Sequence, residues 1–190
     1  MNEALRHALY DGRQSLNYRD FQYALPEHER GIRAPVKHMN PEARERLAYY
    51  QAGIAVAVRL FLPGDRIARI SIVRQGLSWG DVAHFSARES FQGLRTSVQI
   101  VNRLRVAVAG RAAEIEFLGL GSQTLGDYRQ IDRVRNILNS MAVTGMFGHL
   151  GGSLYINGMP RELVSAMEEA YQKALLETRA ALRENQHIVT

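Results

Sequence analysis

The chain has 190 residues, of which 46% are hydrophobic and 23% charged, so it is long enough to bury one hydrophobic core. It contains no cysteine, which excludes disulfides and thiolate metal sites. No apolar run reaches the ~20 residues that a transmembrane helix requires, and the N-terminus lacks a signal-peptide pattern. We therefore expect a soluble globular domain that makes no membrane contact of its own.

The net charge of +5 and the isoelectric point of about 9.8 raise the question of nucleic-acid binding. Lys37 and Lys173 are the only lysines, and the arginines are scattered among acidic residues, as in the stretch 42–46. A nucleic-acid groove needs a basic tract or basic residues alternating with aromatic ones, and neither occurs. We expect no nucleic-acid partner, and the preference for arginine indicates a GC-rich, bacterial genome.

The first part of the chain is predicted to contain two short helices and a linker. The first helix covers residues 2–10 and is ended by Asp11-Gly12. A second helical segment covers residues 18–25 and is stopped by Pro26. The charged stretch 27–37 reads as a linker, because it carries a further proline and no apolar periodicity.

A stronger helix and a strand pair follow. Asn40 as N-cap, with Pro41 at the first helical position, predicts a helix over residues 40–62. Residues 67–73 alternate and are rich in β-branched side chains, which predicts a strand. A turn at Gln75-Gly76 leads to a second strand over residues 79–85, and we expect the two strands to pair.

The remainder of the chain is helical in pattern, so the predicted fold class is mainly α with a small β-sheet. The expected segments are a long helix over 87–118 with a break near Gly93, a loop over 119–126, a helix over 127–146, an extended piece over 154–156, a turn at Asn157-Gly158, and a final helix from Pro160 to about Glu184.

One run on the helix 40–62 carries a family resemblance. Zincins place His-Glu-x-x-His on a helix because residues i and i+4 share a face, so two imidazoles meet one zinc ion while the glutamate polarises its water. Residues 48–55 read Ala-Tyr-Tyr-Gln-Ala-Gly-Ile-Ala. This run resembles the zinc helix of FtsH-type AAA zinc metalloproteases, with Tyr50 and Ile54 in place of the two histidines and Gln51 in place of the glutamate.

Further matches follow in the same order as in that family. Residues 69–76 resemble its first strand and turn, and Trp79-Gly80 resembles the start of its edge strand. Residues 109–114, Ala-Gly-Arg-Ala-Ala-Glu, are similar to the family's Gly-Gly-Arg-Ala-Ala-Glu. Residues 125–128 fall where the family has its third zinc ligand, which corresponds to Asp127. The resemblance implies an FtsH-peptidase-like helical domain.

The resemblance also implies a domain division. Residues 1–36 resemble the end of an AAA lid subdomain plus its linker, and residues 37–190 the peptidase domain, here a C-terminally short fragment of a longer parent. ATP would be bound only by an AAA module of that parent, because no Gly-x-x-x-x-Gly-Lys-Ser/Thr motif occurs here. The parent would place this domain on the cytoplasmic side, with any membrane anchor supplied by the parent.

The function implied is that of a pseudoprotease within an AAA protein-quality-control machine. No cofactor is expected in this chain, whereas active relatives bind zinc, and Asp127 is the only retained residue of ligand type. The edge strand at Trp79, Gly80, Asp81 and Val82 is expected to bind unfolded or extended polypeptide by β-addition. The expected assembly is a hexamer of this chain or a mixed ring with active relatives.

An alternative stays open, in which the protein is an active ATP-dependent metallopeptidase with a relocated metal site. His84 or His149 with Asp127 would be the residues of such a site. No Gly-x-Ser-x-Gly run supports a metal-free serine nucleophile. Glu114 is expected to be a structural acid that balances an arginine. Asp127 is expected to bond the Tyr50 hydroxyl.

Overall fold

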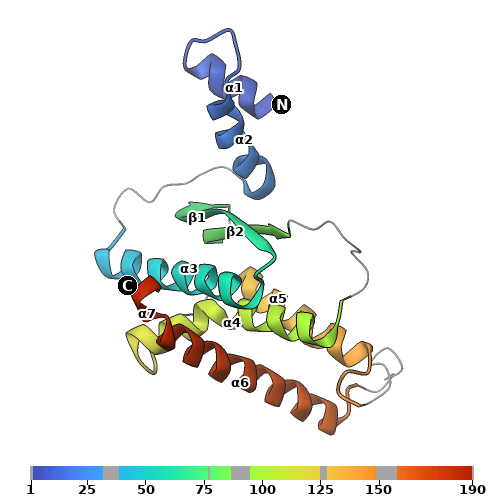
Figure 1. Cartoon of the computed structure of the whole chain (residues 1–190). Helices are drawn as coiled ribbons and strands as arrows, with labels where there is room; N and C mark the ends of the chain where they lie inside the picture. The colour runs from blue at the N-terminus through green and yellow to red at the C-terminus, as the bar shows by residue number, and fades with distance from the viewer. Residues whose placement is uncertain are drawn as a thin grey trace.

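The computed structural model describes residues 2–31, 39–76, 78–86, 95–124, 128–148 and 158–189, and it confirms a mainly α fold with a small sheet (Figure 1). The elements are α1 (Asn2–Tyr10), α2 (Tyr18–Arg30), α3 (Pro41–Phe61), β1 (Asp65–Gln75), β2 (Ser78–Ser86), α4 (Ser97–Leu118), α5 (Tyr128–Val143), α6 (Arg161–Glu184) and α7 (Gln186–Val189). Within these ranges, no helix combines the length and apolar character needed to cross a bilayer.

Helix α4 is the centre of the helical core. It contacts α3, α5 and α6, while α3 carries the two strands on its other side (Figure 1). Apolar residues of α3, α4, α5 and α6 meet in one buried cluster. Its buried members are Val56, Leu104, Val108, Ala112, Ala113, Ile115, Leu138, Met141, Ala174, Leu175 and Leu182.

Helix α3 begins where the sequence predicts. The Asn40 side chain accepts a hydrogen bond from the Glu42 N–H at 3.0 Å, which satisfies one of the free N–H groups of the first turn. Pro41 stands at the first helical position, where its missing N–H costs no hydrogen bond. The helix ends at Phe61, one residue before the predicted end, and leads directly into β1.

The two strands pair antiparallel, as predicted, and each is longer than its sequence pattern indicates. Pairing runs from Asp65 opposite Ser86 to Gln75 opposite Ser78, with two register shifts. One shift lies between Ser71 and Arg74 of β1, opposite Gly80 of β2. A bulge of this kind bends the strands and locally increases their twist.

The predicted long helix over 87–118 is wrong at its start. Arg95 and Thr96 are not helical, and α4 begins at Ser97. Thr96 and Gln99 form a capping box, in which the Thr96 hydroxyl accepts from the Gln99 N–H at 3.3 Å and the Gln99 side chain accepts from the Thr96 N–H at 3.0 Å. This local pair fixes the helix start. The predicted segment 87–94, including Gly93, lies outside the described residues.

The elements after α4 lie close to their predicted positions. Residues 119–124 form the expected loop, and α6 follows Pro160 and ends at Glu184, as predicted. Helix α5 ends at Val143, three residues short of the predicted end, because turns follow it. The extended piece predicted over 154–156 lies outside the described residues.

Pro26 does not end helix α2, contrary to the prediction. The helix continues to Arg30 with Pro26 inside it. Proline removes one ladder hydrogen bond, but the following turn keeps its own, and the Gly31 N–H donates to the Glu27 carbonyl at 2.9 Å. Packing against α1 supports this turn, since the Glu27 carboxylate lies 3.1 Å from His7 Nε2.

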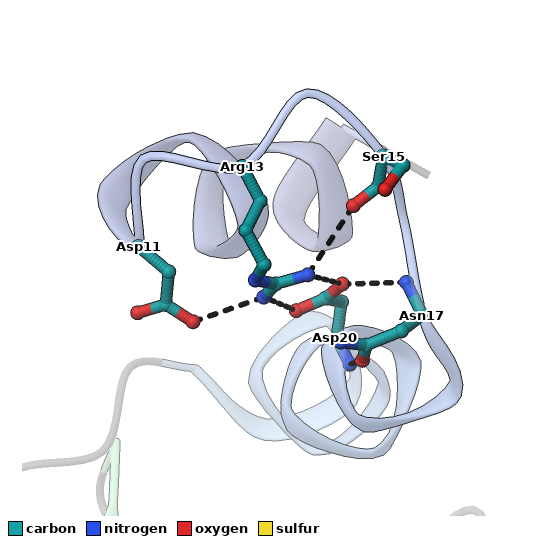
Figure 2. Close-up of polar contacts among 5 residues, drawn as sticks. All are labelled: Asp11, Arg13, Ser15, Asn17 and Asp20. Atoms are coloured by element: carbon teal, nitrogen blue, oxygen red, sulfur yellow. Dashed lines mark hydrogen bonds and ion pairs between the residues drawn. The ribbon is translucent and has the colours of Figure 1, made fainter.

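The turn between α1 and α2 is held by one arginine (Figure 2). The Arg13 guanidinium donates to both carboxylate oxygens of Asp20, at 2.6 and 2.9 Å, and also to Asp11 at 2.9 Å and the Ser15 carbonyl at 3.2 Å. The Asp20 carboxylate also accepts from the Asn17 N–H at 2.8 Å, which completes a capping box at the start of α2.

The stability of this turn is expected to fall in acid. Hydrogen bonds from Arg13 and from the Asn17 N–H lower the pKa of Asp20 to about 2. A carboxyl whose pKa is lower in the folded state stabilises that state above its unfolded pKa of ~4, and this stabilisation is lost as the pH falls through the folded pKa. We predict that acidification from about pH 5 to about pH 2 perturbs the Ala8 and Ala24 methyl resonances in NMR spectra of the whole chain. Asp20→Asn should abolish this response, and an unchanged titration in that variant would contradict the prediction.

Candidate functional site

The candidate site lies on the middle of α3, where the sequence resemblance places a degenerate zinc helix. Tyr50, Gln51 and Ile54 are all buried, with exposed fractions of 6%, 2% and 2%. They face α4 and β2, so the site is enclosed by three elements. Each of the three side chains makes a different kind of contact with its surroundings.

Tyr50 packs its ring on the backbone of α4. A Cβ atom placed on Gly110 would come within 2.3 Å of Tyr50 Cζ, so the ring occupies the space that any side chain at position 110 would need. Gly53, one turn further along α3, makes a similarly close approach, because its Cβ would lie 2.4 Å from that of Ala113. Small residues on both helices therefore bring α3 and α4 into close contact around Tyr50.

Gln51 links α3 to the strand β2. Its side-chain amide donates a hydrogen bond from Nε2 to the Trp79 carbonyl at 3.0 Å. Gly80 makes room for this amide, since a Cβ there would lie 2.8 Å from Gln51 Nε2 and 2.5 Å from the Ser71 carbonyl oxygen. Gly80 also has φ +84°, a left-handed conformation that disfavours other residues. The bulge, the glycine and the glutamine thus form one local arrangement.

Ile54 belongs to a second buried apolar cluster. This cluster joins α3 to Val82 of β2 and to Val106 and Ala109 of α4, and it also includes Tyr50. Ile54 has no atom that can coordinate a metal, and its position in the cluster is that of an ordinary core residue.

A small cavity of about 100 Å³ lies beside the Tyr50 ring. Its lining includes Glu114, whose two carboxylate oxygens accept hydrogen bonds from the Thr124 N–H at 3.2 Å and from the Thr124 hydroxyl at 2.8 Å. Glu114 is a structural acid, as expected, but these bonds come from Thr124 and not from an arginine. Arg111, also at this cavity, donates instead to the Tyr171 hydroxyl at 2.9 Å.

The side chains present here do not fit a zinc ion. A catalytic zinc needs three protein ligands, usually histidine or carboxylate, and the three α3 positions offer a phenol, an amide bonded to a carbonyl, and a hydrocarbon. His84 lies in β2, where its Nδ1 is 2.7 Å from the Asp65 carboxylate. Among the described residues, no three His, Asp or Glu side chains come together as a metal-binding group. Asp127 and His149 lie outside those residues, as does the proposed bond between Asp127 and Tyr50.

The residues predicted to bind peptide all lie in β2, and they differ in exposure. Trp79 is 43% exposed and carries the Arg74 guanidinium over its ring, 5.0 Å from the centroid. Gly80, Asp81 and Val82 are buried, and Asp81 pairs with Arg69 at 3.0 Å. The side chains of Asp81 and Val82 therefore face the domain, whereas Phe85 further along β2 is exposed, and β-addition near Trp79 would use the strand backbone.

Two contacts at this site were not foreseen from the sequence. The Gln51–Trp79 bond joins residues 28 positions apart, and the Tyr50–Gly110 contact joins residues 60 positions apart. The glycine within the stretch 109–114 was the one available signal for the second contact, because a glycine in a helix interior often marks a close approach.

Comparison with known proteins identifies the family of this domain. A sequence model of the family described as "Peptidase family M41" matches residues 37–186. Similar proteins include "ATP-dependent zinc metalloprotease FtsH" from Rhodothermus marinus, 29% identical over 151 residues, which are 79% of this chain and 21% of the relative. Proteins named "ATP-dependent zinc metalloprotease FtsH 1" from Sorangium cellulosum and Salinibacter ruber are 28% and 27% identical over 89% and 92% of the chain. The chain spans only 27% and 25% of the lengths of these two relatives.

Placing a glutamate at position 51 is expected to destabilise the fold. A carboxylate cannot donate to the Trp79 carbonyl, so Gln51→Glu would bury a charge facing an acceptor and cost about 3 kcal/mol at pH 7. Gln51→Met, which removes the bond without adding a charge, should cost less. Urea unfolding measures the free energies of unfolding of both variants. The difference between these two free energies should narrow in acid, as the buried carboxyl of the Gln51→Glu variant is protonated. A Gln51→Glu variant as stable as the unaltered chain would refute the role of this bond.

A side chain at position 110 is expected to disturb the packing of α3 on α4. Gly110→Ala places a methyl group in the space that the Tyr50 ring occupies, and this overlap should destabilise the chain by about 1–3 kcal/mol. The cost should shrink when Tyr50→Ala is combined with it, because the ring is then absent. Thermal or urea unfolding of the two single variants and the double variant measures this coupling, and additive costs would show that the two residues do not meet.

Proposed function

Because this chain belongs to peptidase family M41, we propose that it is a proteolytically inactive member, a pseudoprotease domain with a binding role. The observation that carries the proposal is the burial of Tyr50, Gln51 and Ile54 in packing contacts, on the run of α3 that resembles the zinc helix of the family. Each side chain makes a packing or hydrogen-bonding contact within the fold. None of the three supplies the ligands or the base that metal-dependent peptide hydrolysis requires.

What the three residues do here is structural. Tyr50 fills the space above Gly110, Gln51 bonds the backbone of β2, and Ile54 joins the apolar cluster between the two helices and the strand. Together they support the inner side of β2 against α3. A domain that keeps this strand in place, with no metal-binding group among its described residues, is suited to hold a polypeptide and not to cut it.

The proposed ligand is unfolded or extended polypeptide, paired with β2 by β-addition near Trp79. One backbone acceptor of this segment, the Trp79 carbonyl, is already bonded to Gln51. A docking strand would therefore pair with the remaining backbone groups of β2 or displace the amide. The role fits a ring-forming part of an ATP-dependent quality-control machine, either a hexamer or a mixed ring with active subunits, in the longer protein.

The inactivity is tested by metal analysis together with a degradation assay. We expect the purified chain to hold far less than one zinc per chain and to leave an unfolded protein substrate intact, with or without a chelator. Stoichiometric zinc with chelator-sensitive cleavage would overturn the proposal in favour of an active metallopeptidase with a relocated metal site.

Peptide binding at β2 can be followed through Trp79, which is the one tryptophan in the chain. A tryptophan-free unfolded polypeptide should shift or quench its fluorescence in a saturable way. Gln51→Met, which frees the Trp79 carbonyl, should strengthen binding severalfold, while substitution of the exposed Arg59 by glutamine should leave it unchanged. The absence of any saturable response would contradict a peptide-binding role for this strand.

A further inference from the structure

A groove separate from β2 lies between α4, the loop that follows it, and α6. Its volume is about 590 Å³, within the range of ~300–1,000 Å³ typical of ligand sites. Ile115 of α4 and Leu175 of α6 are buried side chains that line it. Leu120 of the loop and Leu176 of α6 also line it, and they are 84% and 60% exposed. The groove therefore has apolar walls that are open to solvent.

The charges along this groove are of one sign. Arg111 and Arg179 both line it, and none of its described lining residues is acidic. Arg111 donates to the Tyr171 hydroxyl at 2.9 Å, and the buried Glu114 carboxylate lies close enough to interact with its charge. Arg179 bonds Glu116 at 3.3 Å, but the same carboxylate also accepts from Arg183 at 3.0 Å. One carboxylate shared by two guanidinium groups leaves excess positive charge beside the groove.

The separation of Tyr171 and Arg179 along α6 indicates the size of a matching ligand. Tyr171, the partner of Arg111, and Arg179 are eight residues apart on α6, or about 12 Å along a helix axis. An extended peptide covers this distance in roughly four residues, at ~3.3 Å per residue. Two carboxylates separated by a pair of bulky apolar residues would meet both arginines and the apolar walls.

We propose that this groove docks a short peptide segment in which acidic residues flank bulky apolar ones. Arginine is favoured for such recognition, because its planar guanidinium binds carboxylates through two parallel hydrogen bonds. The exposed Leu120 and Leu176 provide the apolar contact that gives affinity, and the excess positive charge gives specificity. The segment belongs to a partner protein bound at the helical side of the domain, away from the strand proposed to hold polypeptide.

The test is a selection from a displayed decapeptide library on the whole chain, with counter-selection on the Arg111→Gln/Arg179→Gln double variant. Enriched peptides should carry acidic residues around leucine or phenylalanine. Their affinities, measured by fluorescence anisotropy, should fall at least tenfold in the double variant and weaken as salt increases. Leu120→Ser/Leu176→Gln should also weaken binding. The matched control Arg59→Gln/Arg66→Gln, which removes two exposed arginines elsewhere, should bind normally.

Several outcomes would overturn the proposal. One is the failure of any acidic–apolar peptide to be enriched over the counter-selection, and another is equal binding by the double variant and the control. Binding to anionic phosphatidylglycerol vesicles through these arginines, without peptide enrichment, would make the groove a membrane contact instead. A change of oligomeric state in the double variant, again without enrichment, would make it a contact between copies. The Trp79 fluorescence response should be unaffected by Arg111→Gln/Arg179→Gln, so this proposal and the proposed function fail separately.

Discussion

The close approach of α3 and α4 is the contact on which the rest of the domain depends. It requires Gly53 and Gly110, because a side chain at either position would meet atoms of the facing helix at 2.4 Å or less. Helix α4 then carries α5 and α6 on its remaining faces, and α3 carries the strands. Interiors packed this densely tolerate few changes of volume, so the residues around this contact are strongly constrained.

The same constraint acts on the central turn of α3, which keeps its shape around three side chains that do not fit a zinc site. A pair of buried imidazoles without a metal would need hydrogen-bond partners in an apolar setting. Tyr50 and Ile54 instead add apolar surface to the second core cluster, and Gln51 satisfies a backbone carbonyl of β2. The three residues thereby form part of the framework between two helices and a strand.

Much of the fold could be read from the sequence, because its signals are local. Asn40-Pro41 marks the start of α3, and alternating β-branched residues mark β1. Two predicted helix boundaries are wrong, one for a tertiary reason and one for a local reason. Pro26 predicts a helix end, but packing against α1 carries α2 past it. The helical pattern before Thr96 predicts an early start for α4, whereas the Thr96–Gln99 capping box fixes the start at Ser97.

The candidate site could be located from the sequence but not described. The run 48–55 indicates the helix and the three positions at which it departs from the zinc motif that it resembles. Their contacts depend on residues far along the chain, Trp79 and Gly110, whose positions no local pattern specifies. The groove between α4 and α6 was not foreseen either, because its arginines are 68 positions apart and each reads alone as an ordinary surface charge.

The packing of Tyr50, Gln51 and Ile54 also bears on how the domain can evolve. Each residue contributes to stability through its own partner, which is Gly110, the Trp79 carbonyl or the second apolar cluster. Replacing one of the three by histidine or glutamate would lose that contribution without creating a metal site, since zinc needs several ligands at once. Single substitutions toward a zinc site would therefore pass through less stable proteins. The core that stabilises the fold is in this way a barrier to metal chemistry acquired one residue at a time.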